Sequence, residues 1–149
     1  MTKRNQAIIL IFSIFLALAA GCAARVYSPV PINEAVDVCA ECGMTVRDNG
    51  YASEIIRTDG KVLKFDDVGD LFKYLRENPS TKVGAEFVQD RNTKEWLALD
   101  KAYLVTNTAV PTPMNWGIHA FKTIEEADEF SASLTNSSTN GKPADKMKM

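Results

Sequence analysis

The hydrophobic and polar positions along the chain predict short strands and two helices between a non-periodic leader and a polar tail. Residues 51–58 and 61–66 read as two strands around an Asp-Gly pair, which is typical of a tight β-hairpin turn. Apolar residues then recur at helical spacing over 68–77. Further strands are predicted at 83–89, 96–99, 102–106 and 117–121, and a second helix from 124 to about 134.

This order divides the chain into two similar half-units, each of which begins with two strands and continues into a helix. We see no convincing sequence identity between the halves, so the repeat is one of structure. Strands that are joined by a short turn pair antiparallel. The pattern therefore predicts an α+β fold with mainly antiparallel sheets and helices on one side.

The N-terminus has the features of an export signal. Lys3 and Arg4 precede an apolar run over residues 7–20, and Ala19-Ala20-Gly21-Cys22 follows. The run is shorter than the roughly 20 residues that a spanning helix needs. We therefore expect residues 1–21 to be a lipoprotein signal peptide and Cys22 to carry the lipid, which places the protein outside the cytoplasm on a membrane. A plain secreted protein that is cleaved nearby is the alternative.

Two further segments lack the periodicity of a folded domain. Residues 22–37 contain two prolines and are expected to be the lipidated cysteine and a tether. Residues 135–149 are rich in polar side chains and are expected to be a disordered tail. The domain would then occupy residues 38–134.

The charge of the chain excludes one class of partner. The full chain has 17 basic and 19 acidic residues, and removal of Lys3 and Arg4 leaves 15 basic residues. An acidic balance without a Lys/Arg cluster argues against binding of nucleic acid. The lipid, rather than a basic patch, would hold the protein at the membrane.

Candidate chemistry begins with Cys39 and Cys42, which are separated by two residues and followed by Gly43 and Met44. A disulfide across so small a loop would stabilise the fold little, so metal or redox chemistry is the stronger interpretation. Thiolates with a thioether form a soft ligand set that selects Cu(I) over harder ions. Met44 could instead be a core side chain.

A second candidate segment is residues 110–119. Two prolines stiffen this loop and would present Met114 at low entropic cost. His119, which is the one histidine of the chain, follows five residues later and is a competent copper ligand when neutral. Burial of Met114 in the core, and a structural role for His119, are the alternatives.

Taken together, the lipobox-like cysteine, CAECGM, DGKVLKFDDVGDLFKYL and TPMNWGIHAF resemble the NosL family of nitrous-oxide reductase accessory lipoproteins. The resemblance covers roughly residues 38–130. It implies two related ββαβ units, similar to part of the organomercurial lyase fold. It also implies Cys39, Cys42, Met44, Met114 and His119 as ligand candidates for one Cu(I).

The resemblance further implies a copper chaperone rather than an enzyme. It would support the catalytic copper centre of nitrous-oxide reductase, beside a membrane ABC-type maturation complex. The residues leave three alternatives open: a thiol-disulfide protein that uses the CxxC, a structural zinc site, and delivery of copper to a different enzyme.

Overall fold

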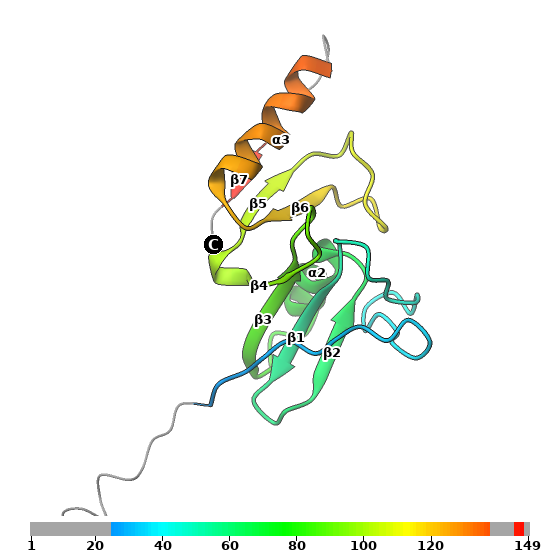
Figure 1. Cartoon of the computed structure of the whole chain (residues 1–149). Coiled ribbons are helices and arrows are strands. Elements are labelled where there is room, and N and C mark those ends of the chain that lie inside the picture. The colour runs from blue at the N-terminus through cyan, green and yellow to red at the C-terminus, as the bar shows by residue number, and fades with distance from the viewer. Residues whose placement is uncertain (1–24, 138–144, 148–149) are drawn as a thin grey trace, which may run out of the picture.

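The computed structural model describes residues 25–137 and 145–147. The predicted signal peptide and the lipidation of Cys22 lie outside these residues. Across the described ranges, no helix combines the length and apolar character needed to cross a membrane. The chain forms two antiparallel sheets, each with its own helix (Figure 1), which confirms the predicted α+β class.

The first sheet contains β1 (Ser53–Arg57), β2 (Val62–Phe65), β3 (Val83–Gln89) and β4 (Trp96–Ala98). Its strand order is β2-β1-β3-β4, and every neighbouring pair is antiparallel. Helix α2 (Val68–Glu77) connects β2 to β3 and packs against β1 and β2. The first unit is therefore a ββαβ motif with β4 added at its edge.

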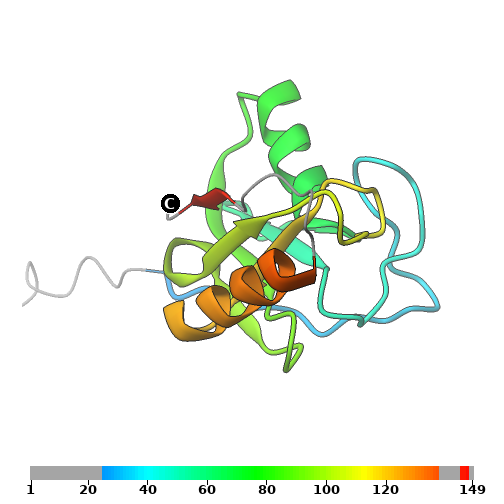
Figure 2. The same ribbon diagram turned by 90° about the horizontal axis from the view of Figure 1, so that it is seen from above.

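The second unit repeats this order. A short 3₁₀ helix, η1 (Leu99–Lys101), leads into β5 (Tyr103–Thr106), β6 (Ile118–Phe121), α3 (Ile124–Ser137) and β7 (Asp145–Met147). The sheet order β6-β5-β7 matches β2-β1-β3, with the first strand in the centre each time. Seen from above, strands lie between the two helices (Figure 2). The prediction of two related units is confirmed.

Local sequence explains why α2 begins and ends where it does. Asp67 is the N-cap, and its side chain accepts a hydrogen bond from the backbone N–H of Gly69. Asn78 closes the helix with its backbone N–H on the carbonyl of Tyr74. Val68 and Leu71 turn inward onto the core, where they join Ile55, Phe65 and Val88 among other buried side chains.

The tail differs from the prediction of disorder over 135–149. Helix α3 continues to Ser137, and Asp145–Met147 pairs antiparallel with β5 as β7. The free edge of β5 offers unpaired backbone groups, and a strand of any composition can satisfy them. A polar composition therefore did not exclude a strand here.

Residues 25–37 do not stand away from the domain as a free tether would. This N-terminal strap lies along the first sheet. Arg25 donates to the carbonyl of Thr58 at 2.6 Å, and the backbone N–H of Val30 donates to Glu54 Oε1 at 2.9 Å.

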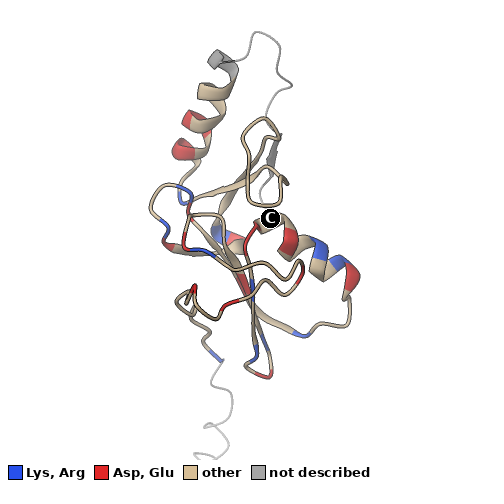
Figure 3. Cartoon of the chain, turned by 90° about the vertical axis from the view of Figure 1, so that its right-hand side faces the viewer, with Lys and Arg blue, Asp and Glu red and all other residues tan. Residues whose placement is uncertain are grey.

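The lysines and arginines of the described residues are scattered over the ribbon (Figure 3).

Candidate metal site

The cysteine loop, residues 38–45, is closed by its own backbone. The N–H of Cys39 donates to the carbonyl of Met44 at 2.7 Å, and the N–H of Gly43 donates to the carbonyl of Cys39 at 3.0 Å. Gly43 has a φ of 77°, a conformation that side chains with a Cβ rarely adopt. The glycine of the CGM sequence is thus what allows the chain to return after Cys42.

Contacts with β2 and α2 hold this loop in place. The N–H of Ala40 donates to the carbonyl of Lys64 at 2.9 Å, and Glu41 forms an ion pair with Lys73 of α2. The carboxylate of Glu41 is thereby paired with the ammonium group of Lys73. The loop is therefore held to β2 and α2 by the two residues between the cysteines.

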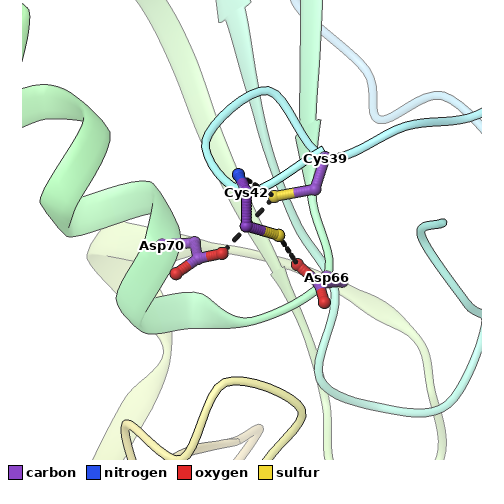
Figure 4. A group of neighbouring side chains, drawn as sticks. All are labelled: Cys39, Cys42, Asp66 and Asp70. Atoms are coloured by element: carbon purple, nitrogen blue, oxygen red, sulfur yellow. Dashed lines mark hydrogen bonds between the residues drawn. The ribbon is translucent and has the colours of Figure 1, made fainter. Parts of the chain in front are cut away.

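Both thiols face carboxylates at the start of α2 (Figure 4). Cys42 Sγ lies 3.2 Å from Asp66 Oδ1, and Cys39 Sγ lies 3.4 Å from Asp70 Oδ2, each thiol donating. One ligand atom from each of these four residues lies within 4.8 Å of the other three. Cys39 and Cys42 are free thiols. We call these four residues the thiol–carboxylate cluster.

The surroundings favour protonated thiols in the metal-free protein. Burial raises the pKa of Cys39 above its usual value. Burial raises the pKa of Cys42 as well, and the neighbouring Cys39, Asp66 and Asp70 add to that effect. Negative carboxylates beside a thiol disfavour the thiolate. A cation that enters the cluster would reverse this effect, because it compensates the negative charge.

The three sulfur-containing residues of the cysteine loop differ in their exposure to solvent. Cys39 is 3% exposed, Cys42 is partly buried, and Met44 is 51% exposed. The sequence leaves open whether Met44 is a core residue, and its exposure argues against that alternative. The cysteine loop therefore carries one buried thiol, one partly buried thiol and one exposed thioether.

Read from the sequence, Asp66, Asp67 and Asp70 look like helix capping and first-turn charge. Asp67 does cap α2, but Asp66 and Asp70 are 4% and 2% exposed and face the thiols. One signal was available: a cap needs one carboxylate, and three within five residues exceed that need. The placement of the cysteine loop over the helix could not be read from the chain.

The proline loop, residues 110–117, is docked on the same end of α2. Asp67 Oδ2 accepts from Thr112 Oγ1 at 2.6 Å and from the backbone N–H of Met114 at 2.9 Å. Thr112 Oγ1 also accepts from the N–H of Gly117. Met114, which is partly buried, therefore belongs to a loop that is fixed beside the cluster.

Trp116 adds a direct link between the proline loop and the cluster. Its indole Nε1–H donates to Asp70 Oδ1 at 2.7 Å. The ring lies against Gly69, where an added Cβ would come within 2.0 Å of Trp116 Cγ. Trp116 is 37% exposed, so part of the residue remains open to solvent.

His119 lies in different surroundings from the thiols. It is fully buried on β6 against the rings of Tyr51 and Phe130, and Arg91 Nη1 lies 2.9 Å from its Nδ1. Arginine is only a donor, so Nδ1 accepts and the neutral ring carries its proton on Nε2. In this conformation His119 has no free lone pair for a metal ion, and we expect it to be structural.

Comparison with known proteins agrees with this architecture. A family model for NosL matches residues 29–136. The chain belongs to the NosL family. The match begins inside the strap and ends in α3, so it covers the whole first ββαβ unit of this NosL-family chain and the second unit as far as its helix.

A solved structure shares the fold. It is the crystal structure of the copper chaperone NosL from Shewanella denitrificans, with a TM-score of 0.61 and 19% sequence identity. The alignment covers 75% of this chain and 89% of the other. A search of curated proteins found no match.

Proposed function

We propose that this NosL-family chain is a copper chaperone that binds one Cu(I) at the cysteine loop and passes it to an acceptor. The observation that carries the proposal is the pairing of two free thiols on one short loop that also carries an exposed thioether, Met44. Sulfur ligands select Cu(I). Membership of the NosL family, and a structural neighbour described as a copper chaperone, support the same function.

Cys39 and Cys42 are the central ligands in this proposal, and Met44 and Met114 complete the set. Each thiol loses its proton to solvent when the ion binds. Asp66 and Asp70 stay beside the sulfurs, where the positive ion offsets their charge. Because Cys42 and Met44 reach the surface, a thiolate or thioether of an acceptor can approach the bound ion.

An anaerobic Cu(I) titration against a competing chelator tests this proposal. The protein should begin at residue 23 so that the whole strap is retained. We expect one Cu(I) per chain, at least 100-fold weaker binding for Cys42→Ser, and about tenfold weaker binding for Met114→Ser. Equal affinity of Met114→Ser and wild type would remove Met114 from the site. No binding by the wild type would end the copper proposal.

We further propose lipid anchoring at Cys22 and delivery to the catalytic centre of nitrous-oxide reductase with a membrane ABC-type complex. The export-like N-terminus and the family resemblance support this finer assignment. Mass spectrometry of the chain from a membrane fraction should detect lipid on Cys22. In a host that makes the reductase, loss of the chain should leave that enzyme without its catalytic copper centre. A normal centre would instead favour another copper enzyme as the acceptor.

A zinc site is the second candidate, because the thiol–carboxylate cluster offers four residues with zinc-binding side chains. Metal analysis of protein purified without added metal separates the two. Stoichiometric zinc that survives dialysis against a weak chelator would favour zinc. A thiol-disulfide function is disfavoured, because such enzymes depend on a low thiol pKa and burial raises both pKa values here.

A further inference from the structure

Asp70 lies between the two segments that carry the proposed ligands. Its Oδ2 accepts from Cys39 Sγ at 3.4 Å, and its Oδ1 accepts from the indole N–H of Trp116 at 2.7 Å. The side chain is 2% exposed, so water does not compete for either oxygen. A single carboxylate therefore connects the cysteine loop to the proline loop.

The two bonds differ in strength. A thiol is a weak donor, whereas the short bond from an indole N–H to a carboxylate is charge-assisted. Trp116 therefore fixes the orientation of the carboxylate, and Cys39 adapts to it. The close contact with Gly69 holds the indole ring against the first turn of α2.

Metal binding at Cys39 would change this arrangement. The ion replaces the thiol proton, which leaves to solvent, so Asp70 Oδ2 loses its donor and faces a metal-bound thiolate instead. The indole bond to Oδ1 does not involve the thiol and is retained. Any rotation of Asp70 is then passed to Trp116, and Met114 is only two residues away in a loop fixed by Asp67.

We propose that Asp70 and Trp116 form a latch that sets the position of Met114 relative to the thiols and responds to metal on Cys39. Neither residue is a metal ligand in this proposal, and both are positioning residues. The inference rests on the proposed function, because it assumes that Cu(I) binds the thiols. It assigns a role to the partly exposed tryptophan of the proline loop.

The first test uses the indole N–H signals in ¹⁵N–¹H NMR spectra of the full chain in detergent micelles. The chain has two tryptophans, and Trp96→Phe assigns the remaining signal to Trp116. We expect the Trp116 signal to be shifted downfield by its carboxylate partner and to move when one equivalent of Cu(I) is added anaerobically. Cu(I) is diamagnetic, so the signal stays visible. In Cys39→Ser the movement should be largely lost.

The second test is a double-mutant cycle on Cu(I) affinity. Trp116→Phe keeps a ring over Gly69 but removes the donor. If the latch acts through Met114, Trp116→Phe should weaken binding about tenfold in the wild type and less than twofold in Met114→Ser. Met44→Ser is the matched control, because Met44 is a thioether on the other loop. In the Met44→Ser background, Trp116→Phe should still weaken Cu(I) binding about tenfold.

The outcomes separate the latch from the proposed function. If the wild type binds Cu(I) and Trp116→Phe binds it equally well, the latch is wrong while the chaperone stands. The latch is also wrong if Trp116→Phe weakens Met114→Ser as much as it weakens wild type, since the effect would then be general. If the wild type binds no Cu(I), the proposed function fails first. Asp70→Asn retains an oxygen acceptor for the indole. A smaller loss of Cu(I) affinity in Asp70→Asn than in Trp116→Phe would therefore support the latch independently.

Discussion

The thiols of Cys39 and Cys42 compete with protons for any metal ion that they bind. Burial raises both pKa values, so each thiol is protonated at neutral pH and must release a proton on binding. We therefore predict that Cu(I) affinity increases by about 100-fold per pH unit between pH 6 and 8, because two protons are displaced. Titrations against a chelator of known pH dependence measure this slope.

Cys39→Ser is the control for this prediction. With one thiol left, the slope should fall to about tenfold per pH unit. A slope near tenfold in the wild type itself would mean that a single cysteine binds the ion. A flat profile would contradict a thiolate site altogether.

His119 allows a prediction about stability that is independent of metal. Burial, and then the charge of Arg91, lowers the pKa of His119 from 6.5 to about 4. Below pH 6.5 the unfolded chain takes up the proton first, so folding stability falls as the pH drops from 6.5 towards 4. Relative to His119→Gln, which keeps an acceptor for Arg91, the wild type should lose roughly 1–3 kcal/mol over this range. Urea unfolding curves at several pH values measure the difference.

Glu54 titrates in the same pH range with the opposite sign. Burial raises its pKa from 4.5 to about 6, so its contribution to stability is lost as the pH rises through that interval. Glu54 is unchanged in His119→Gln, so its contribution cancels in the comparison. If wild type and variant show parallel pH profiles, His119 takes up its proton as readily in the folded protein as in the unfolded chain, and its lowered pKa is wrong.

At the level of single residues, the sequence indicated the sulfur-containing candidates more readily than the residues around them. CxxCGM identifies Cys39, Cys42 and Met44 as candidates because soft ligands at short spacing have few other uses. From the sequence, Asp66 and Asp70 are interpreted as capping or first-turn residues of the helix, since a capping carboxylate cannot be distinguished there from a carboxylate of the cluster. Tertiary packing of two distant loops distinguishes them.

Among the elements, α2 makes a close contact with the proline loop at Gly69. Alanine in place of an exposed helical glycine stabilises a helix by about 1 kcal/mol. At Gly69, however, a Cβ would lie 2.0 Å from Trp116 Cγ. We therefore predict that Gly69→Ala lowers the free energy of unfolding by about 1–2 kcal/mol, as measured by thermal or urea denaturation.

The matched control removes the indole ring with which the new Cβ would clash. In a Trp116→Ala background, Gly69→Ala should change sign and become stabilising, because only the helix propensity remains. If Gly69→Ala is stabilising with Trp116 present, the indole does not lie on the first turn of α2. That result would also remove the structural basis of the latch.

The sequence predicted some elements more closely than others. The helix at 68–77 and the strand at 83–89 have the observed bounds, because apolar period and turn residues agree there. The predictions for 96–99 and 124–134 were off by a few residues at an end. β7 was missed, since its polar residues carry no period and only the free edge of β5 makes it a strand.

Across the whole molecule, the candidate site depends on both ββαβ units. The cysteine loop and α2 lie in or next to the first unit, while Thr112, Met114 and Trp116 belong to the β5–β6 connection of the second. The repeat could be anticipated from the order of elements. The way in which the two units meet could not, because no local pattern encodes the docking of one loop on another helix.

The candidate site also depends on the N-terminal strap. Lys64 of β2 is 7% exposed, and its Nζ donates to the carbonyl of Pro31 and to Asp37 Oδ2. The next residues after Asp37 enter the cysteine loop, and Lys64 also accepts the N–H of Ala40 through its backbone. One lysine therefore holds the strap and supports the loop that carries the thiols.

We predict that Lys64→Met loosens the strap without unfolding the domain. Methionine keeps the apolar stem but removes the donor from the carbonyl of Pro31 and the charged donor from Asp37, which keeps the N–H of Asn33. We expect a cost of about 1–3 kcal/mol. Hydrogen exchange at the N–H of Val30, which donates to Glu54, should become at least tenfold faster. Cu(I) affinity should fall as well, because Cys39 lies only two residues after the end of the strap. Lys61→Met in the exposed hairpin turn is the control and should change neither quantity. If exchange accelerates while Cu(I) affinity is unchanged, the strap and the site are independent, and residues 25–37 behave as the simple tether that the sequence predicts.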